Sequence, residues 1–72
     1  MSEAAASFAE LTRALANDPE YRQALTTQLA ARSVDEETLR QLITYARNRQ
    51  TTPGHAMARR VLTDAGISWE AL

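Results

Sequence analysis

The chain has 72 residues, a formal net charge of −1, one histidine and no cysteine. Disulfides and thiolate metal sites are therefore excluded, and a single histidine cannot build a structural zinc site. The length predicts a single domain over residues 1–72. A domain this small buries only about 60% of its unfolded surface, which leaves helix packing and self-association as sources of stability. A homodimer is therefore an open alternative.

The charge is distributed unevenly along the chain. Residues 1–37 carry seven acids and three arginines, a net charge of −4. Residues 38–63 carry five arginines and no acid, a net charge of +5, and residues 64–72 add two acids. All eight cations are arginines and 14 residues are alanines, so codon usage points to a high-GC bacterium or its phage. The chain is thus a charge dipole with a basic third quarter.

Residues 3–31 predict two helices separated by the segment NDPE. Asp18 can cap the second helix, and Pro19 suits its first position. Apolar residues recur at helical spacing in both helices and mark one buried stripe on each. These residues are Phe8, Leu11 and Leu15 in residues 3–16, and Tyr21, Leu25 and Leu29 in residues 19–31.

A third helix is predicted over about residues 36–49. Two starts remain open: Ser33 forms a capping box with Glu36, or Asp35 is the cap and Val34 packs on Leu39. The apolar residues recur at i, i+3, i+4 and i+7, the spacing of one helix face. They are Leu39, Leu42, Ile43 and Ala46.

A fourth helix is predicted to begin at Pro53, with Thr52 as its cap. Gly66 suits a left-handed stop, after which Ile67 can contact Leu62. The segment SWEAL is too short for a further helix, so we expect a last turn that packs back on the bundle. The residues expected to pack are Ala58, Val61, Leu62 and Ala65 of the helix, with Trp69 and Leu72 of the turn.

These elements predict an all-α fold, a small four-helix bundle with antiparallel neighbours, short loops and a short C-terminal helical turn. Each apolar stripe is narrow, so one small core must use all of them. The expected core residues are Phe8, Leu11, Leu15, Leu25, Leu29, Leu39, Leu42, Ile43, Val61 and Leu62.

The sequence gives no sign of catalysis. No nucleophile, base and orienting group stand out as a set, and the two glycines, Gly54 and Gly66, punctuate helices rather than cradle a phosphate. We therefore expect no enzyme activity, no cofactor and no metal. No apolar run approaches the length of a membrane span, and the N-terminus lacks the features of a secretory signal, so the expected location is cytoplasmic.

The basic stretch RNRQTTPGHAMARR raises the functional question. It is either the polar surface of a helix junction or a binding surface. Tyrosine, tryptophan and arginine are the residues that dominate protein interfaces, so we expect a regulatory or adaptor protein whose basic junction meets an acidic partner. His55 and Arg59 are expected on an outward face of the fourth helix. The candidate partner-binding residues are Arg40, Tyr45, Arg47, Arg49, His55, Arg59 and Trp69.

The alternative is a transcriptional regulator that binds DNA. The stretches ETLRQLITYA and ARRVL resemble helix-turn-helix motifs of repressors. That resemblance implies a reading helix whose first residues, with His55 and Arg59 among them, face the major groove. The link from Ala46 to Val61 is longer than the tight turn of such motifs, and Arg47 stands where they usually carry glycine. A compact turn over residues 47–52 with a projecting fourth helix would favour this alternative.

Overall fold

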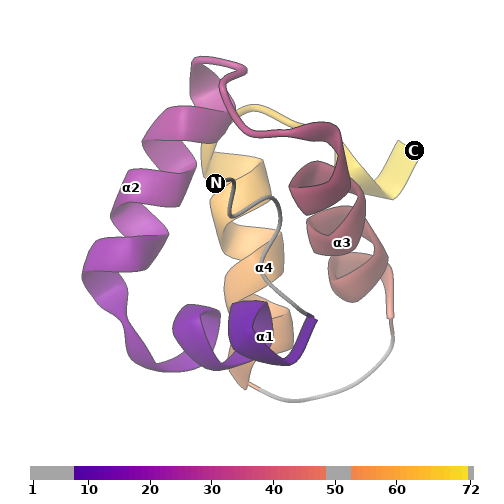
Figure 1. The fold of residues 1–72 in the computed structure, drawn as a ribbon. Coiled ribbons are helices and arrows are strands. Elements are labelled where there is room, and N and C mark those ends of the chain that lie inside the picture. Colours follow the sequence, from indigo (N-terminus) through magenta and orange to yellow (C-terminus); the bar gives the residue numbers. More distant parts are fainter. Residues whose placement is uncertain (1–7, 49–52, 72) are drawn as a thin grey trace.

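The computed structural model describes residues 8–48 and 53–71, and the side chains of Phe8, Pro53 and Ala71 are outside that description. The described residues form α-helices and one 3₁₀ turn, and they contain no strand, as predicted (Figure 1). The helices are Phe8–Asn17 (α1), Pro19–Ala30 (α2), Glu36–Arg47 (α3) and Pro53–Asp64 (α4), and the 3₁₀ turn is Trp69–Ala71 (η1).

Helix α4 occupies the centre of the bundle and packs against α1, α2 and α3. Figure 1 shows α2 and α4 running in the same direction and α3 running in the opposite one. Helix α1 lies across the amino end of α4. The turn η1, the last element of the chain, packs against α3 and α4. The arrangement is the predicted small helical bundle, with α4 as the element that the other three share.

The first helix boundary follows the predicted chemistry. Asp18 is the only residue between α1 and α2, and its side chain accepts a hydrogen bond of 3.1 Å from the backbone N–H of Tyr21. Pro19 occupies the first turn of α2, where its missing N–H costs no hydrogen bond. The predicted start of the first helix at residue 3 lies outside the described residues.

Of the two starts predicted for α3, the structure has the one capped by Asp35. Its side chain accepts a hydrogen bond of 2.9 Å from the backbone N–H of Thr38. Ser33 instead bonds back to the end of α2, because its N–H donates to the carbonyl oxygen of Gln28 over 2.8 Å. The expected cap at Thr52 lies outside the described residues.

Two helices end in a left-handed residue. At the end of α4, Gly66 has φ of 81°, and the N–H groups of Gly66 and Ile67 donate to Thr63 and Leu62 over 3.0 and 2.9 Å. These two hydrogen bonds form a Schellman motif, which closes the helix at Gly66 as predicted. The end of α2 repeats it with Arg32, a non-glycine residue with φ of 59°, which the sequence analysis did not identify.

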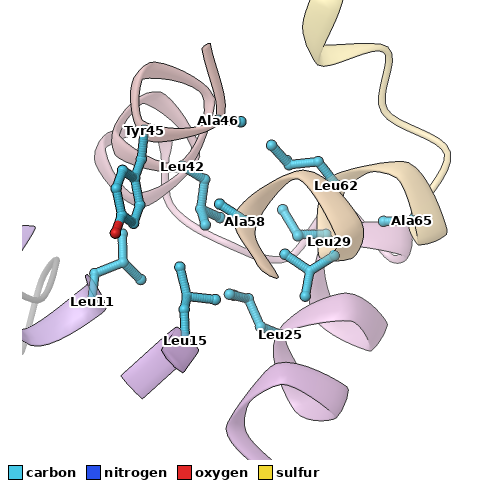
Figure 2. Close-up of a cluster of buried hydrophobic side chains, with 11 residues drawn as sticks. Leu11, Leu15, Leu25, Leu29, Leu42, Tyr45, Ala46, Ala58, Leu62 and Ala65 are labelled. Carbon is cyan, nitrogen blue, oxygen red and sulfur yellow. The ribbon is translucent and has the colours of Figure 1, made fainter. Parts of the chain in front are cut away.

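The core joins all four helices, and Figure 2 shows it as one cluster. Seven of the ten predicted core residues are fully buried. Leu39 and Ile43 are only partly buried against the core, and the side chain of Phe8 is outside the description. The buried hydrophobic residues are Leu11, Leu15, Leu25, Leu29, Leu42, Tyr45, Ala46, Ala58, Val61, Leu62 and Ala65.

The α3 stripe is therefore rotated from the predicted one. Leu42 and Ala46 are buried as expected, but Tyr45 takes the place assigned to Ile43. Burying an aromatic ring removes more apolar area from water than burying isoleucine, and the stripe spacing alone does not distinguish the two rotations. α3 also ends at Arg47, two residues before the predicted end.

Replacing Gly66 with alanine should lower the free energy of unfolding by about 1 kcal/mol, because an L-residue is strained at positive φ. A side chain there would meet no atom within 4 Å, so the backbone conformation is the only cause. Chemical denaturation of the synthetic chain measures the change. D-alanine at the same position is the control, since it favours positive φ and should retain full stability. An equal loss with both isomers would contradict this explanation.

The cap of α3 should make stability depend on pH. Hydrogen bonds from the side chain and backbone of Thr38 lower the pKa of Asp35 below its usual range. The folded state therefore gains stability above the unfolded pKa of about 4 and loses it as the pH falls through the lower folded value. Asp35→Asn keeps the cap without the titration. The stability difference between the two proteins should shrink on acidification, and a constant difference would contradict the assignment.

Candidate functional site

Two side chains of the basic stretch close the carboxyl end of α3. His55 and Arg59 lie one turn apart on α4. Nδ1 of His55 is 2.9 Å from the carbonyl oxygen of Tyr45, and Nε of Arg59 donates to the carbonyl oxygen of Ala46 over 2.8 Å. A carbonyl only accepts hydrogen bonds, so Nδ1 of His55 carries the hydrogen. Both carbonyls belong to the last turn of α3, where a helix has few backbone donors left. The carbonyl of Tyr45 also accepts from the backbone N–H of Asn48 over 3.2 Å.

The predicted outward face for His55 and Arg59 is therefore wrong. Only 5% of His55 is exposed, and Arg59 is half-buried. The physical reason is the negative end of the α3 dipole, which attracts a cation and leaves carbonyl groups that need donors. The antiparallel neighbour α4 supplies both donors from the same face.

Tyr45 is also buried rather than exposed, with only 2% of its surface accessible. Its ring meets the ring of His55 edge to face, with centroids 6.1 Å apart. Gly54 makes room for the hydroxyl group: a methyl group at residue 54 would lie 2.8 Å from Oη of Tyr45 and 3.1 Å from the carbonyl oxygen of Thr12. A tyrosine at this position is thus a packing residue between α1, α3 and α4, and it cannot be an exposed contact in this conformation.

Trp69 of η1 covers Arg59 from the other side. The guanidinium carbon of Arg59 lies 4.9 Å from the centroid of the Trp69 ring, within cation–π range. The indole Nε1 donates to Oγ1 of Thr63 over 3.1 Å, and the ring is partly buried against the core. Trp69 therefore packs back on the bundle against α4, as expected for the last turn of the chain.

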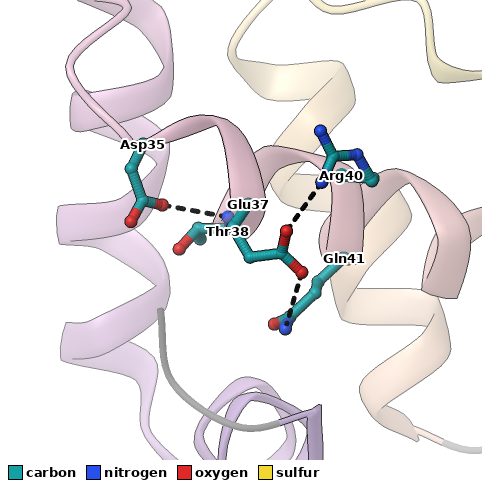
Figure 3. A network of polar contacts seen from close by, with 5 residues as sticks. All are labelled: Asp35, Glu37, Thr38, Arg40 and Gln41. Carbon is teal, nitrogen blue, oxygen red and sulfur yellow. Dashed lines mark hydrogen bonds and ion pairs between the residues drawn. The ribbon is translucent and has the colours of Figure 1, made fainter. Parts of the chain in front are cut away.

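Arg40 and Arg47 face outward on α3. Arg40 is paired with Glu37 over 2.6 Å, and Gln41 reaches the same carboxylate over 3.5 Å (Figure 3). Both side chains of the ion pair are more than half exposed, at 65% and 54%. Arg47 is exposed and lines a shallow hollow of about 420 Å³ with Ile43, Thr44 and Asn48. Arg49 lies outside the described residues.

The six candidate residues that the structure describes separate into distinct groups. Tyr45, His55 and Arg59 are turned toward the bundle, and Trp69 is half-buried. Arg40 and Arg47 form the outward group, and both are exposed on α3. In the part of the chain that the structure describes, the predicted basic junction thus consists of an internal cap with an external face beside it.

Arginine caps recur at two further helix ends, and the sequence analysis missed both. Arg22 donates to the carbonyl oxygen of Leu15 over 2.6 Å at the end of α1. Arg32 donates to Leu29 over 2.7 Å at the end of α2. The position of each arginine in the sequence could have indicated these caps. Arg22 lies in the first turns of α2, shortly after α1 ends, and Arg32 lies just after the end of α2.

Two other features, a metal site and a membrane span, are not found among the described residues. No group of three histidine, aspartate or glutamate side chains in residues 8–48 and 53–71 comes together to hold a metal ion. No helix in the same part of the chain has the length and apolar character needed to cross a bilayer.

Arg59→Met should lower the free energy of unfolding by about 1.5 kcal/mol, the low end for a hydrogen bond made by a charged group, because Arg59 is only half-buried. Arg60→Met is the matched control, since Arg60 makes an exposed ion pair with Asp64 over 3.4 Å. Such pairs contribute about 0–1 kcal/mol, so this loss should be smaller. Urea denaturation of both variants measures the difference. Equal losses would mean that Arg59 does not stabilise the α3 end.

No protein-family model matches this chain, and no curated protein or solved structure matches it. Its function is therefore argued from the contacts, exposure and charge of the described residues.

Proposed function

We propose that this chain is a non-enzymatic regulatory or adaptor protein that binds a protein partner through the outer α3 face. This face consists of Arg40, Ile43, Thr44, Arg47 and Asn48. The observation that carries the proposal is the exposure of Arg47 next to the half-buried Ile43 at the rim of a shallow hollow. The face retains the outward part of the basic junction predicted from the sequence. A single domain in the cytoplasm is part of the same proposal.

The composition of this face suits an acidic protein surface. Arg40, Thr44 and Arg47 follow at i, i+4 and i+7, so they lie along one side of α3. Arginine binds carboxylates through two parallel hydrogen bonds, and it is enriched at interfaces for that reason. The partly buried Ile43 adds apolar area between the two cations. A partner would therefore offer carboxylates on both sides of an apolar contact.

The ion pair already present on this face is easily exchanged. Arg40 and Glu37 are mostly exposed, so their attraction is weakened by water and contributes little to folding. A carboxylate of the partner can take the place of Glu37 at small cost. Desolvation in the interface then strengthens the new contact relative to the exposed one.

DNA binding is less well supported. The helix-turn-helix alternative needs His55 and Arg59 on an outer surface of α4, whereas both contact backbone carbonyls of α3. Helix α4 also packs against three other helices, which disfavours its projection into a groove of a duplex. Residues 49–52, four of the six in the turn that would distinguish the two functions, lie outside the described residues.

Arg47→Glu should reduce capture of the partner from a lysate of the source cells by at least about tenfold, because the new carboxylate repels the acidic surface. Arg13→Glu is the matched control: Arg13 is exposed on α1, and the change in net charge is the same. Capture by this control should equal that of the unmodified chain, and thermal unfolding should confirm that both variants fold.

Equal capture by the two variants would remove the outer α3 face from the interface. Titration of labelled duplex DNA at low and higher salt completes the test. The proposal predicts no binding even at low salt. If the logarithm of the affinity falls linearly with the logarithm of the salt concentration, the slope gives the number of phosphates neutralised. That result would favour DNA over a protein as the partner.

A further inference from the structure

A second surface lies between α2 and α4, away from the outer α3 face. Residues of both helices line an open groove of about 420 Å³, here called the α2/α4 groove. Each helix contributes residues at i, i+3, i+4 and i+7 positions, so the groove follows both helices for two turns. It is lined by Pro19, Arg22, Gln23 and Thr26 of α2, and by Met57, Arg60, Val61 and Asp64 of α4.

From this geometry we infer that the α2/α4 groove binds an acidic amphipathic helix of a protein partner. Two turns of helix correspond to a length of about 11 Å, which matches two turns of a third helix laid along the groove. A bound helix would place apolar residues on the groove floor and carboxylates over its basic edges. This is a helix-in-groove mode of recognition, with anchors at i, i+4 and i+7.

The floor of the groove is apolar and adaptable. Val61 is buried, and Met57 is partly buried against the core while its surface also lines the groove. Methionine has an unbranched and polarisable side chain that fits contacts of different shape. Apolar side chains of a bound helix would therefore find a contact that a phosphate backbone would not use. This favours a peptide over a nucleic acid.

The edges of the groove are basic, one on each helix. Arg22 is half-buried and held by its hydrogen bond of 2.6 Å to the carbonyl oxygen of Leu15, so its charge is fixed in position. Arg60 is exposed on the opposite edge, and its only ion pair among the described residues is with Asp64 over 3.4 Å. An exposed pair of this length exchanges readily for a carboxylate of a partner. The lining holds two arginines and one aspartate, so its net charge is positive and complementary to an acidic helix.

The test uses a synthetic helical peptide with leucines on one face and glutamates beside them, and the same peptide with lysines in place of the glutamates. Amide chemical shifts of the isotope-labelled protein are followed during titration. We expect the glutamate peptide to shift the amides of Gln23, Thr26, Met57 and Arg60. Arg60→Glu should weaken binding by at least about tenfold through like-charge repulsion, whereas Arg13→Glu should leave it unchanged.

Several outcomes would overturn the inference. They are the absence of shifts, shifts confined to the outer α3 face, and equal binding of the lysine peptide. Shifts of the same groove residues with protein concentration alone would also overturn it, because a second copy of the chain would then fill the groove. Arg47→Glu separates the two proposals: it should leave peptide binding unchanged, so failure here does not affect the outer α3 face.

Discussion

The carboxyl end of α3 is closed by side-chain donors from another helix, beside the backbone N–H of its cap residue Asn48. His55 and Arg59 provide them from α4, at 2.9 and 2.8 Å from successive carbonyl groups. Successive carbonyls of a helix are turned by about 100°, so both bonds form together only when α4 is at one height and one rotation relative to α3. The contact thus fixes the register of the central helix, against which α1, α2 and α3 all pack.

The arginines of the basic stretch have two different roles: one stabilises a helix end, and others are exposed. Arg59 is held between the α3 end and the Trp69 ring, where its charge stabilises a helix terminus. Arg22 and Arg32 serve the ends of α1 and α2 in the same way. A guanidinium group suits this role because its planar fork of donors is always charged. Net charge along the sequence therefore overstates the charge that is offered to a partner, and exposure must be known for each arginine.

Local signals in the sequence predicted the helices, the Asp18 cap and the closure at Gly66, because these features involve residues close in the chain. The rotation of α3 was not predictable in this way. Ile43 and Tyr45 both lie near the apolar stripe, and the choice between them depends on the space beside Gly54 of another helix. The inward orientation of His55 and Arg59 depends likewise on the end of α3 lying next to α4. Contacts between helices are not encoded in local periodicity, so the outward half of the candidate site, Arg40 and Arg47, was easier to predict than the inward half.

The central claim is that Arg59 is a fixed donor to the backbone of α3, whereas an exposed arginine such as Arg13 is solvated. Exchange of the arginine Nε–H protons with water, measured by NMR at low temperature, tests this claim most directly. The account predicts slow exchange for Arg59, whose Nε–H is bonded to Ala46, and fast exchange for Arg13, which is exposed. A scalar coupling from Nε of Arg59 to the carbonyl carbon of Ala46 would identify the bond itself. Equally fast exchange at Arg59 and Arg13 would contradict the account, because Arg59 would then not be held by the backbone of α3.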